Sequence, residues 1–194
     1  MKKLLSLVLV TILVIVFAGC GGADNNTPSP APDQSNGSSS TEGIVKLGLG
    51  QQVSIAKSKS VEGDKEAVAQ VDTVMAAVGF DKDGKIASIT IDTAQTRVNF
   101  DKNGNLTSDP AAEQKTKVEL GDGYGMKKSS EIGKEWYEQI SELEKWMLGK
   151  TVDEIKNMKT KDNAVPDDPE LTSLITISVQ DYINVVSESF DNAK

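Results

Sequence analysis

The sequence predicts an α+β domain, in which an antiparallel β-meander packs with helices that follow it along the chain. In the first half, apolar residues alternate or run in β-branched stretches, a pattern typical of strands. Asp-Gly and Asn-Gly pairs interrupt this half and favour hairpin turns. In the second half the apolar spacing changes to three and four, the period of a helix. Strands followed by helices indicate the α+β class.

The first expected strand, or pair of strands, lies within residues 44–55, and the second lies within residues 68–80. The Asp83-Gly84 pair then joins the second strand to a third that begins at Ile86. Such a pair between two apolar runs predicts a type I′ turn, which requires a positive φ at both central residues.

A similar turn sequence recurs about twenty residues later around Asn103 and Gly104. It extends the predicted meander through residues 98–100 and then residues 117–120. Neither turn has the ligand spacing of a calcium loop, because the glycine comes one position early and the twelfth position lacks Glu. We therefore expect structural turns and no metal.

A long helix is expected over residues 132–147, where apolar side chains share one face. Ser129 or Ser130 can cap its start, and Gly149 can close its end.

Two further helices are predicted after this one. Thr151 and Glu154 have the spacing of a capping box and begin a short helix. The last helix is expected from about Ser178, with Asp181 at its capping-box position.

Composition excludes several classes of function. The 194 residues contain no histidine and a single cysteine, which removes the usual neutral-pH base and the common Ser-His-Asp and Cys-His catalytic sets. The carboxylates are dispersed, and no spacing among them indicates a hydrolase. The net charge of −8 does not favour nucleic acid as a partner.

The glycine-rich segment over residues 121–125 is the most informative local feature. Its glycines let backbone amides approach a ligand, and Tyr124 or Trp136 offers a ring that can stack on a planar group. The alternative is a plain turn whose aromatic side chain fills the core. Both interpretations remain open from the sequence.

The N-terminus has the pattern of a secretory signal. Two lysines precede an apolar run over residues 4–17, which is too short to span a bilayer as a stable helix. Residues 17–20, Phe-Ala-Gly-Cys, resemble the lipobox of bacterial lipoprotein precursors. That resemblance implies a signal peptide over residues 1–19 and a lipid on Cys20, while an uncleaved anchor helix is the alternative.

Residues 20–42 form the expected lipidated cysteine and flexible tether, because Gly, Ser, Pro, Asn and Asp dominate and large apolar side chains are missing. A single domain is expected over residues 43–194. The lipid on Cys20 would hold that domain at the extracytoplasmic face of the cell membrane.

The order of these features resembles the FMN-binding domain of membrane-anchored electron-transfer lipoproteins and of flavin subunits in ion-pumping redox complexes. The shared features are the hairpin strand over residues 85–92, the glycine-rich loop, the helix that ends near Gly149 and a Thr/Ser-rich run before the last helix. The chain also resembles a divergent branch of that family, described as membrane immunogens. The resemblance implies FMN as the cofactor and an envelope redox partner.

In that family a threonine before the last helix carries FMN through a phosphoester bond. Glu170, Ser173 and Thr176 fall in register with this motif, whereas Leu174-Ile175 replaces its Gly-Ala pair. The resemblance implies FMN contacts from these three residues and from the glycine-rich loop, namely Gly123, Tyr124 and Gly125. The alternative is an envelope lipoprotein that binds another ligand or partner and keeps the fold without the flavin.

Overall fold

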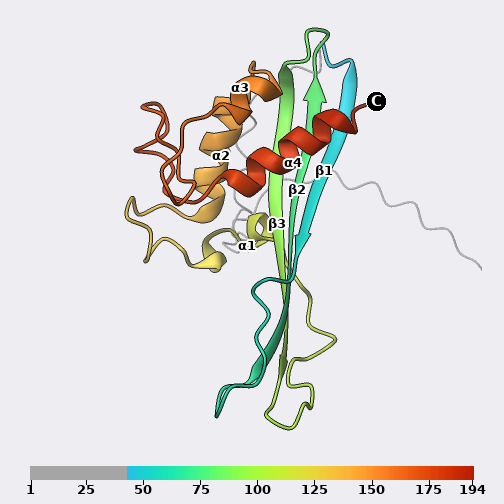
Figure 1. Cartoon of the computed structure of the whole chain (residues 1–194), viewed down its shortest axis with the longest axis vertical. Coiled ribbons are helices and arrows are strands. Elements are labelled where there is room, and N and C mark those ends of the chain that lie inside the picture. Colours follow the sequence, from blue (N-terminus) through green and yellow to red (C-terminus); the bar gives the residue numbers. More distant parts are fainter. Residues whose placement is uncertain (1–42) are drawn as a thin grey trace, which may run out of the picture. The chain divides into compact units, whose positions relative to one another are not determined.

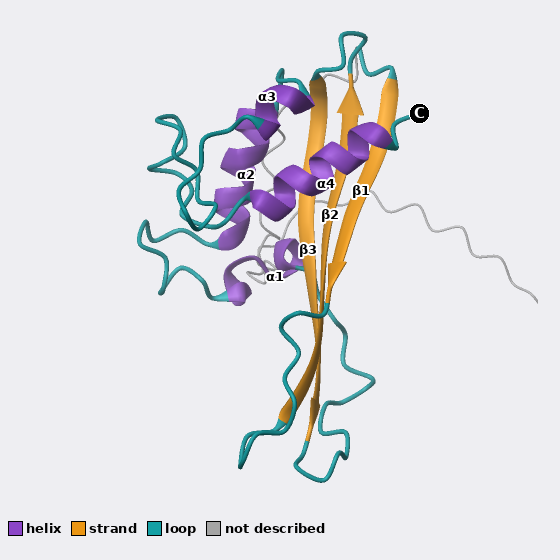
Figure 2. Ribbon diagram, viewed as in Figure 1, coloured by secondary structure: helices purple, strands orange, loops and turns teal. Residues whose placement is uncertain are grey.

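The structure is a computed structural model that describes residues 43–194; the expected signal peptide, Cys20 and tether lie outside the described residues. One antiparallel sheet has the strand order β1-β2-β3. Helices follow the strands along the chain, which confirms the α+β class (Figures 1 and 2). The elements are β1 (Lys46–Ser54), β2 (Ala67–Phe80), β3 (Ile86–Phe100), α1 (Lys117–Leu120), the 3₁₀ helix η1 (Gly121–Tyr124), α2 (Trp136–Met147), α3 (Val152–Lys156) and α4 (Gln180–Asp191).

The β2–β3 hairpin turns where the Asp-Gly pair predicts it, but the turn type differs. Gly84 has a φ of 75°, but the φ of Asp83 is not positive. A type I′ turn requires a positive φ at both residues, so this turn is of another type. Instead, Asp81 Oδ1 accepts hydrogen bonds from the amides of Asp83 (2.9 Å) and Lys85 (2.8 Å). An aspartate at the first position therefore closes the turn from its side chain.

Residues 117–120, predicted to be a strand, form the short helix α1. Thr116 Oγ1 accepts from the Glu119 amide (3.3 Å), and Glu119 Oε2 accepts from the Thr116 amide (2.7 Å). This reciprocal capping box satisfies amides that a strand would direct at a neighbour, which explains the helical outcome.

The predicted start of α2 was wrong, because Ile132 precedes the helix and neither Ser129 nor Ser130 caps it. Glu135 caps α2 and forms a reciprocal pair with Glu138. Gly149 follows the end of the helix with a φ of 76°, as predicted.

The capping box that Thr151 and Glu154 were predicted to form is present at the start of α3. By contrast, α4 begins at Gln180 after Val179 without any side-chain cap, so the box predicted at Asp181 was wrong. Its start is held instead by packing, since Val179 is fully buried.

Two glycines of β1 let α4 lie directly on the sheet. A Cβ on Gly48 would come within 1.8 Å of Ser189 O, and a Cβ on Gly50 would come within 1.8 Å of Val185 O. The large residues of β1 therefore point to the opposite face, where Leu47 and Leu49 are 66% and 56% exposed. Among the described residues, helices cover only the glycine face (Figure 1).

The outer edge of β1 is closed by the C-terminal segment. Leu47 exchanges two backbone hydrogen bonds with Lys194, at 3.0 and 3.1 Å. Asn192 Nδ2 donates to Leu49 O (3.1 Å), and Glu188 Oε2 accepts from the Gln51 amide (2.9 Å). Because its N–H and C=O groups are occupied, this part of the edge cannot recruit a further strand.

The hydrophobic core lies between the glycine face of the sheet and helices α2, α3 and α4. Trp136 at the start of α2 is 1% exposed and donates from Nε1 to the Tyr182 hydroxyl of α4 (2.9 Å). This bond fixes the first turn of α2 against α4 and, with it, the segment that leads into α2. No helix within residues 43–194 is long and apolar enough to cross a membrane.

Candidate ligand-binding site

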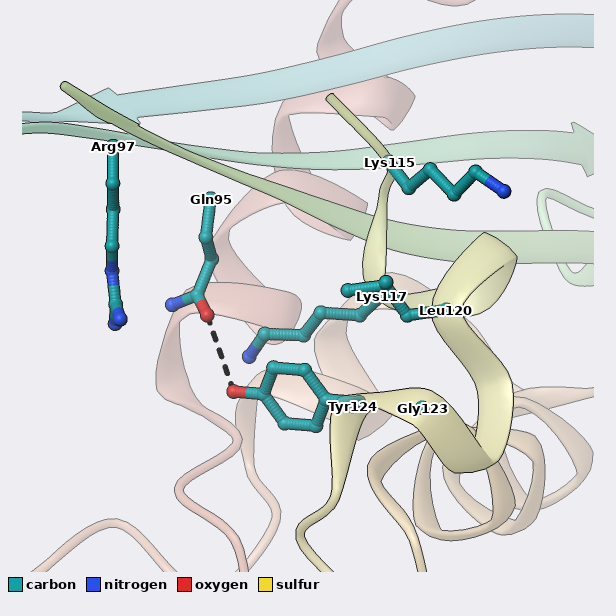
Figure 3. A pocket seen from close by; sticks show the side chains of 7 residues that line it. All are labelled: Gln95, Arg97, Lys115, Lys117, Leu120, Gly123 and Tyr124. Atoms are coloured by element: carbon teal, nitrogen blue, oxygen red, sulfur yellow. Dashed lines mark hydrogen bonds between the residues drawn. The ribbon is translucent and has the colours of Figure 1, made fainter. Parts of the chain in front are cut away.

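A cavity of about 370 Å³ opens between β3 and the α1–η1 segment (Figure 3). This volume lies in the range of small-molecule sites, which begins at about 300 Å³. The residues that line the cavity are mostly polar, and three of them are basic: Gln95, Arg97, Lys115, Lys117, Leu120, Gly123 and Tyr124.

Strand β3 supplies one wall of the cavity through Gln95 and Arg97. These residues are two apart on the strand, so their side chains leave the same face of the sheet. Gln95 Oε1 accepts a hydrogen bond from the Tyr124 hydroxyl (3.2 Å), which ties the strand to η1 (Figure 3). Arg97 Nε donates to Gln70 Oε1 of β2 (3.0 Å), and among the described residues its two Nη groups have no acceptor.

Helix α1 places Lys117 at the opposite wall. Thr116 forms a β-bridge with Ala94 of β3, and the Val118 amide donates to Asp92 Oδ1 (3.2 Å). These two contacts fasten α1 to the edge of β3. Lys117 is the first residue of the helix, and its side chain extends along the cavity between Gln95 and Tyr124 (Figure 3).

The ammonium of Lys117 is held by aromatic rings and not by a carboxylate. Its Nζ lies 4.8 Å from the centre of the Tyr124 ring and 4.9 Å from that of Trp136, within the range of cation–π contacts. Lys117 is only 8% exposed, and within residues 43–194 its Nζ has no hydrogen-bond acceptor and no salt bridge. Burial, followed by the nearby Lys57 charge, lowers the pKa of Lys117 to about 8.

Positive charge gathers here although the chain is acidic overall. Arg97 is the single arginine among the 21 basic residues of the sequence, and it lines the cavity together with Lys115 and Lys117. The nearby carboxylate of Asp72 is already engaged, because it accepts from Lys57 Nζ (2.6 Å) and Gln70 Nε2 (2.6 Å). The cavity therefore has a local positive potential.

The glycine-rich segment is anchored from the start of α2. Glu135 is 2% exposed, and its two carboxylate oxygens accept from the amides of Met126 (2.8 Å) and Lys127 (2.9 Å). Tyr137 adds a hydrogen bond from its hydroxyl to Asp122 Oδ1 (3.1 Å). The wall that carries Tyr124 is therefore fixed at both of its ends.

The structure brings part of the sequence-predicted site to this cavity. Gly123 and Tyr124 line it, while Gly125 ends η1 with a φ of 77° and is not part of the lining. Tyr124 is half-buried and its ring contacts the Lys117 ammonium. Trp136 lies beneath that ammonium and is covered, so it cannot stack on an added ligand.

The other predicted residues do not line the cavity. Thr176 is half-buried, and Gln139 Oε1 accepts from both its amide (2.9 Å) and its hydroxyl (3.3 Å). Glu170 and Ser173 are exposed within a run of turns. Ile175, one of the two bulky replacements, is a fully buried core residue.

Sequence reasoning missed Lys117, Arg97, Gln95, Lys115 and Leu120. Two signals were available. The Thr-x-x-Glu spacing over residues 116–119 is a capping box and marks the helix that carries Lys117. The second signal is the single arginine in a lysine-rich chain, because a guanidinium can form paired hydrogen bonds that a lysine ammonium cannot.

The fold and this cavity define an α+β domain with a cationic pocket. Within the described range, no group of three or more His, Cys, Asp or Glu side chains could hold a metal ion.

The comparisons with known proteins give one partial similarity. The chain is 49% identical over 47 residues to a chlorophenol reductase from Desulfitobacterium hafniense. The matched segment covers 24% of this chain and 14% of that protein. No protein-family model matches the chain, and no solved structure matches it.

Proposed function

We propose that this protein is an extracytoplasmic lipoprotein whose α+β domain reversibly binds, in the Lys117 pocket, a small ligand that carries both an anionic group and a planar ring, with FMN as the ligand. One observation carries the proposal: the Lys117 side chain is 8% exposed, its ammonium lies against two rings, and its Nζ has no hydrogen-bond acceptor among the described residues. A buried charge without a partner is costly, so an anion that enters the cavity gains an unusually strong contact.

The remaining lining suits a ligand with both a charge and a ring. Tyr124 is half-buried and leaves part of its ring free for stacking. A Cβ on Gly123 would meet no atom within 4 Å, so the wall beside the tyrosine is open to close approach. FMN combines a planar ring system with a phosphate, and the resemblance of the sequence to FMN-binding domains names the same compound.

Reversible binding is favoured over a phosphoester at Thr176. The Thr176 hydroxyl donates to Gln139, and the residue is not part of the cavity lining. Ile175 occupies the core where the family has a small residue, which fixes the segment before Thr176 against the interior. These contacts support a structural role for Thr176 in this chain.

Electron transfer to an envelope redox partner is the function that FMN would serve. FMN would supply the redox chemistry, while the domain would bind and orient it. The name of chlorophenol reductase, the partly similar protein, describes a redox enzyme, which agrees with this proposal. Since the matched segment is 14% of that protein, its activity is not transferred to this chain.

The membrane is the second partner in this proposal, through a lipid on Cys20. In Cys20→Ser, the thiol that would accept the lipid is lost while the domain sequence is unchanged. We expect the wild-type chain to enter the detergent phase of a Triton X-114 extraction and to carry the added mass of the lipid. Cys20→Ser should lack that added mass, whether it enters the aqueous phase or remains an unprocessed precursor. Intact masses that are equal apart from the Cys-to-Ser difference would contradict the lipid anchor.

The flavin proposal is tested on the full chain purified in detergent. After incubation with FMN and gel filtration, we expect flavin absorbance to co-elute with the protein while its intact mass stays unmodified. Thr176→Ala should retain the same absorbance. A mass gain of one FMN moiety that disappears in Thr176→Ala would show covalent attachment instead, and protein without flavin at any concentration would overturn FMN as the ligand.

A further inference from the structure

We propose that the Lys117 pocket recognises the dianion of a phosphate monoester, held between Lys117 and Arg97, and that Gln70 and Asp72 position Arg97 for this contact. The inference rests on the proposed function for the location of the site. It adds the chemical group of the ligand that the cavity recognises and the residues that make the cavity specific for this group.

A chain of hydrogen bonds runs from the surface to the guanidinium. Lys57 Nζ donates to Asp72 Oδ2 (2.6 Å), and Gln70 Nε2 donates to Asp72 Oδ1 (2.6 Å). Gln70 Oε1 then accepts from Arg97 Nε (3.0 Å). Each bond orients the next group, and the bond to Gln70 tethers the exposed Arg97 side chain at Nε.

The ligand-facing side of Arg97 is left free by this arrangement. Because the bond to Gln70 uses Nε, both Nη groups stay available on the side chain that lines the cavity. A guanidinium in this state presents two donors in the geometry that phosphate oxygens accept, whereas Lys117 supplies a compact point charge. Two cations with free donors match a dianion better than a monoanion.

Gln70 and Asp72 occupy positions that folding alone would fill with apolar side chains. They lie on β2 in the alternation that continues through Val74, Ala76 and Val78, and they are 4% and 8% exposed. Burying an amide and a carboxylate there costs free energy relative to apolar residues. A role in holding Arg97 explains why these two buried positions carry polar side chains, whereas packing alone does not.

The test compares FMN with riboflavin, which carries the same ring system without the phosphate. On the full chain in detergent, we expect FMN to bind about ten-fold to a hundred-fold more tightly than riboflavin, as charge-assisted hydrogen bonds imply. Inorganic phosphate should compete with FMN at millimolar concentration, and acetate at equal ionic strength should not.

Substitutions test which residues contact the phosphate of FMN. Arg97→Met should reduce the FMN-to-riboflavin preference by about ten-fold. Gln70→Met, which removes the acceptor for Nε, should reduce the same ratio while leaving riboflavin affinity unchanged. Lys102→Met removes an exposed charge from a turn and serves as the matched control, with the ratio unaltered. A purely structural role for Gln70 would weaken both flavins alike.

The outcomes separate this inference from the proposed function. Equal binding of FMN and riboflavin, without phosphate competition, would overturn the phosphate site while leaving flavin binding intact. Failure of both flavins, with inorganic phosphate raising the Tm of wild type but not of Arg97→Met, would support the phosphate site and overturn FMN. No effect of either flavin or of phosphate would overturn both.

Discussion

The Lys117 ammonium lies 4.9 Å from the centre of the Trp136 ring, which is itself 1% exposed. The lysine thus rests on a buried tryptophan and faces Tyr124 at 4.8 Å on the cavity wall. The two rings are attractive to a cation but accept no strong hydrogen bond. At neutral pH the folded domain therefore holds a largely buried charge that forms no direct ion pair with a carboxylate of the described residues, although Asp72 and Asp92 act on it from farther away.

Replacing this lysine should stabilise the ligand-free protein. The pKa of Lys117 falls from 10.5 to about 8 on folding, which corresponds to a cost on the order of 3 kcal/mol for keeping it charged at pH 7. Lys117→Met retains an apolar stem and removes that cost, while it forgoes the cation–π contacts. We expect the free energy of unfolding at pH 7 to rise by about 1–3 kcal/mol.

Denaturant unfolding at several pH values measures this gain in the free energy of unfolding and shows how it changes with pH. Between about pH 8 and 10.5 the unfolded chain binds more protons at Lys117 than the folded chain does, so wild-type stability should rise with pH in this window. The charges that face Lys117 are Lys57, Arg97, Asp72 and Asp92. Lys117→Met should lack this rise, and a variant less stable than wild type at pH 7 would contradict the argument.

Glu144 on α2 should give the opposite dependence at lower pH. Its Oε1 accepts from the Ile91 amide (2.6 Å), and burial raises its pKa from 4.5 to about 7. Between these values the folded state binds more protons than the unfolded state, so stability falls as pH rises. Asp92 adds to the raised pKa, and Lys145 and the Ile91 amide oppose it.

Glu144→Gln keeps an acceptor oxygen for the Ile91 amide and removes the charge. We expect this variant to be more stable than wild type at pH 8, by on the order of 3 kcal/mol, and equally stable near pH 4. Thermal melts at both pH values measure the difference. A gap between the two proteins that stays constant with pH would show that Glu144 does not titrate in this range.

The contact between β1 and α4 predicts a strong effect at a glycine. In Gly50→Ala the new Cβ would meet Val185 O at 1.8 Å, so α4 must move off the sheet. We expect a loss of about 3 kcal/mol or more in the free energy of unfolding. Gly123→Ala is the matched control because its Cβ meets nothing within 4 Å, and it should change stability by less than about 0.5 kcal/mol. Equal effects of the two substitutions would argue against the close packing of α4.

Local patterns in the sequence predicted most of the elements. The apolar, partly β-branched runs of β2 and β3, the helical period of α4 and the capping box of Thr151 with Glu154 each depend on neighbours within a few residues. The error at residues 117–120 arose because their apolar alternation was interpreted as a strand, while the capping box of Thr116 with Glu119 was not recognised. In such a short segment, two residues that accept hydrogen bonds from each other's amides determine whether the backbone is helical or extended.

The candidate site was less accessible to such reasoning because it depends on distant residues. Lys117, Arg97 and Gln70 meet only after β2, β3 and α1 are placed side by side. The sequence left the glycine-rich segment open between a ligand-binding loop and a plain turn, and in the structure its Gly123 and Tyr124 line the cavity. Thr176 was singled out by resemblance, and the hydrogen bond of its hydroxyl to Gln139 joins two elements far apart in sequence.

The most direct test of the central proposal is a calorimetric titration of FMN into the full chain, compared with Lys117→Met and the control Lys102→Met. We predict that Lys117→Met weakens FMN binding by about ten-fold to a hundred-fold, because one charge-assisted contact is lost. Lys102→Met should bind as wild type does. Equal affinity of wild type and Lys117→Met for FMN would contradict the proposal that the buried ammonium forms the ligand site.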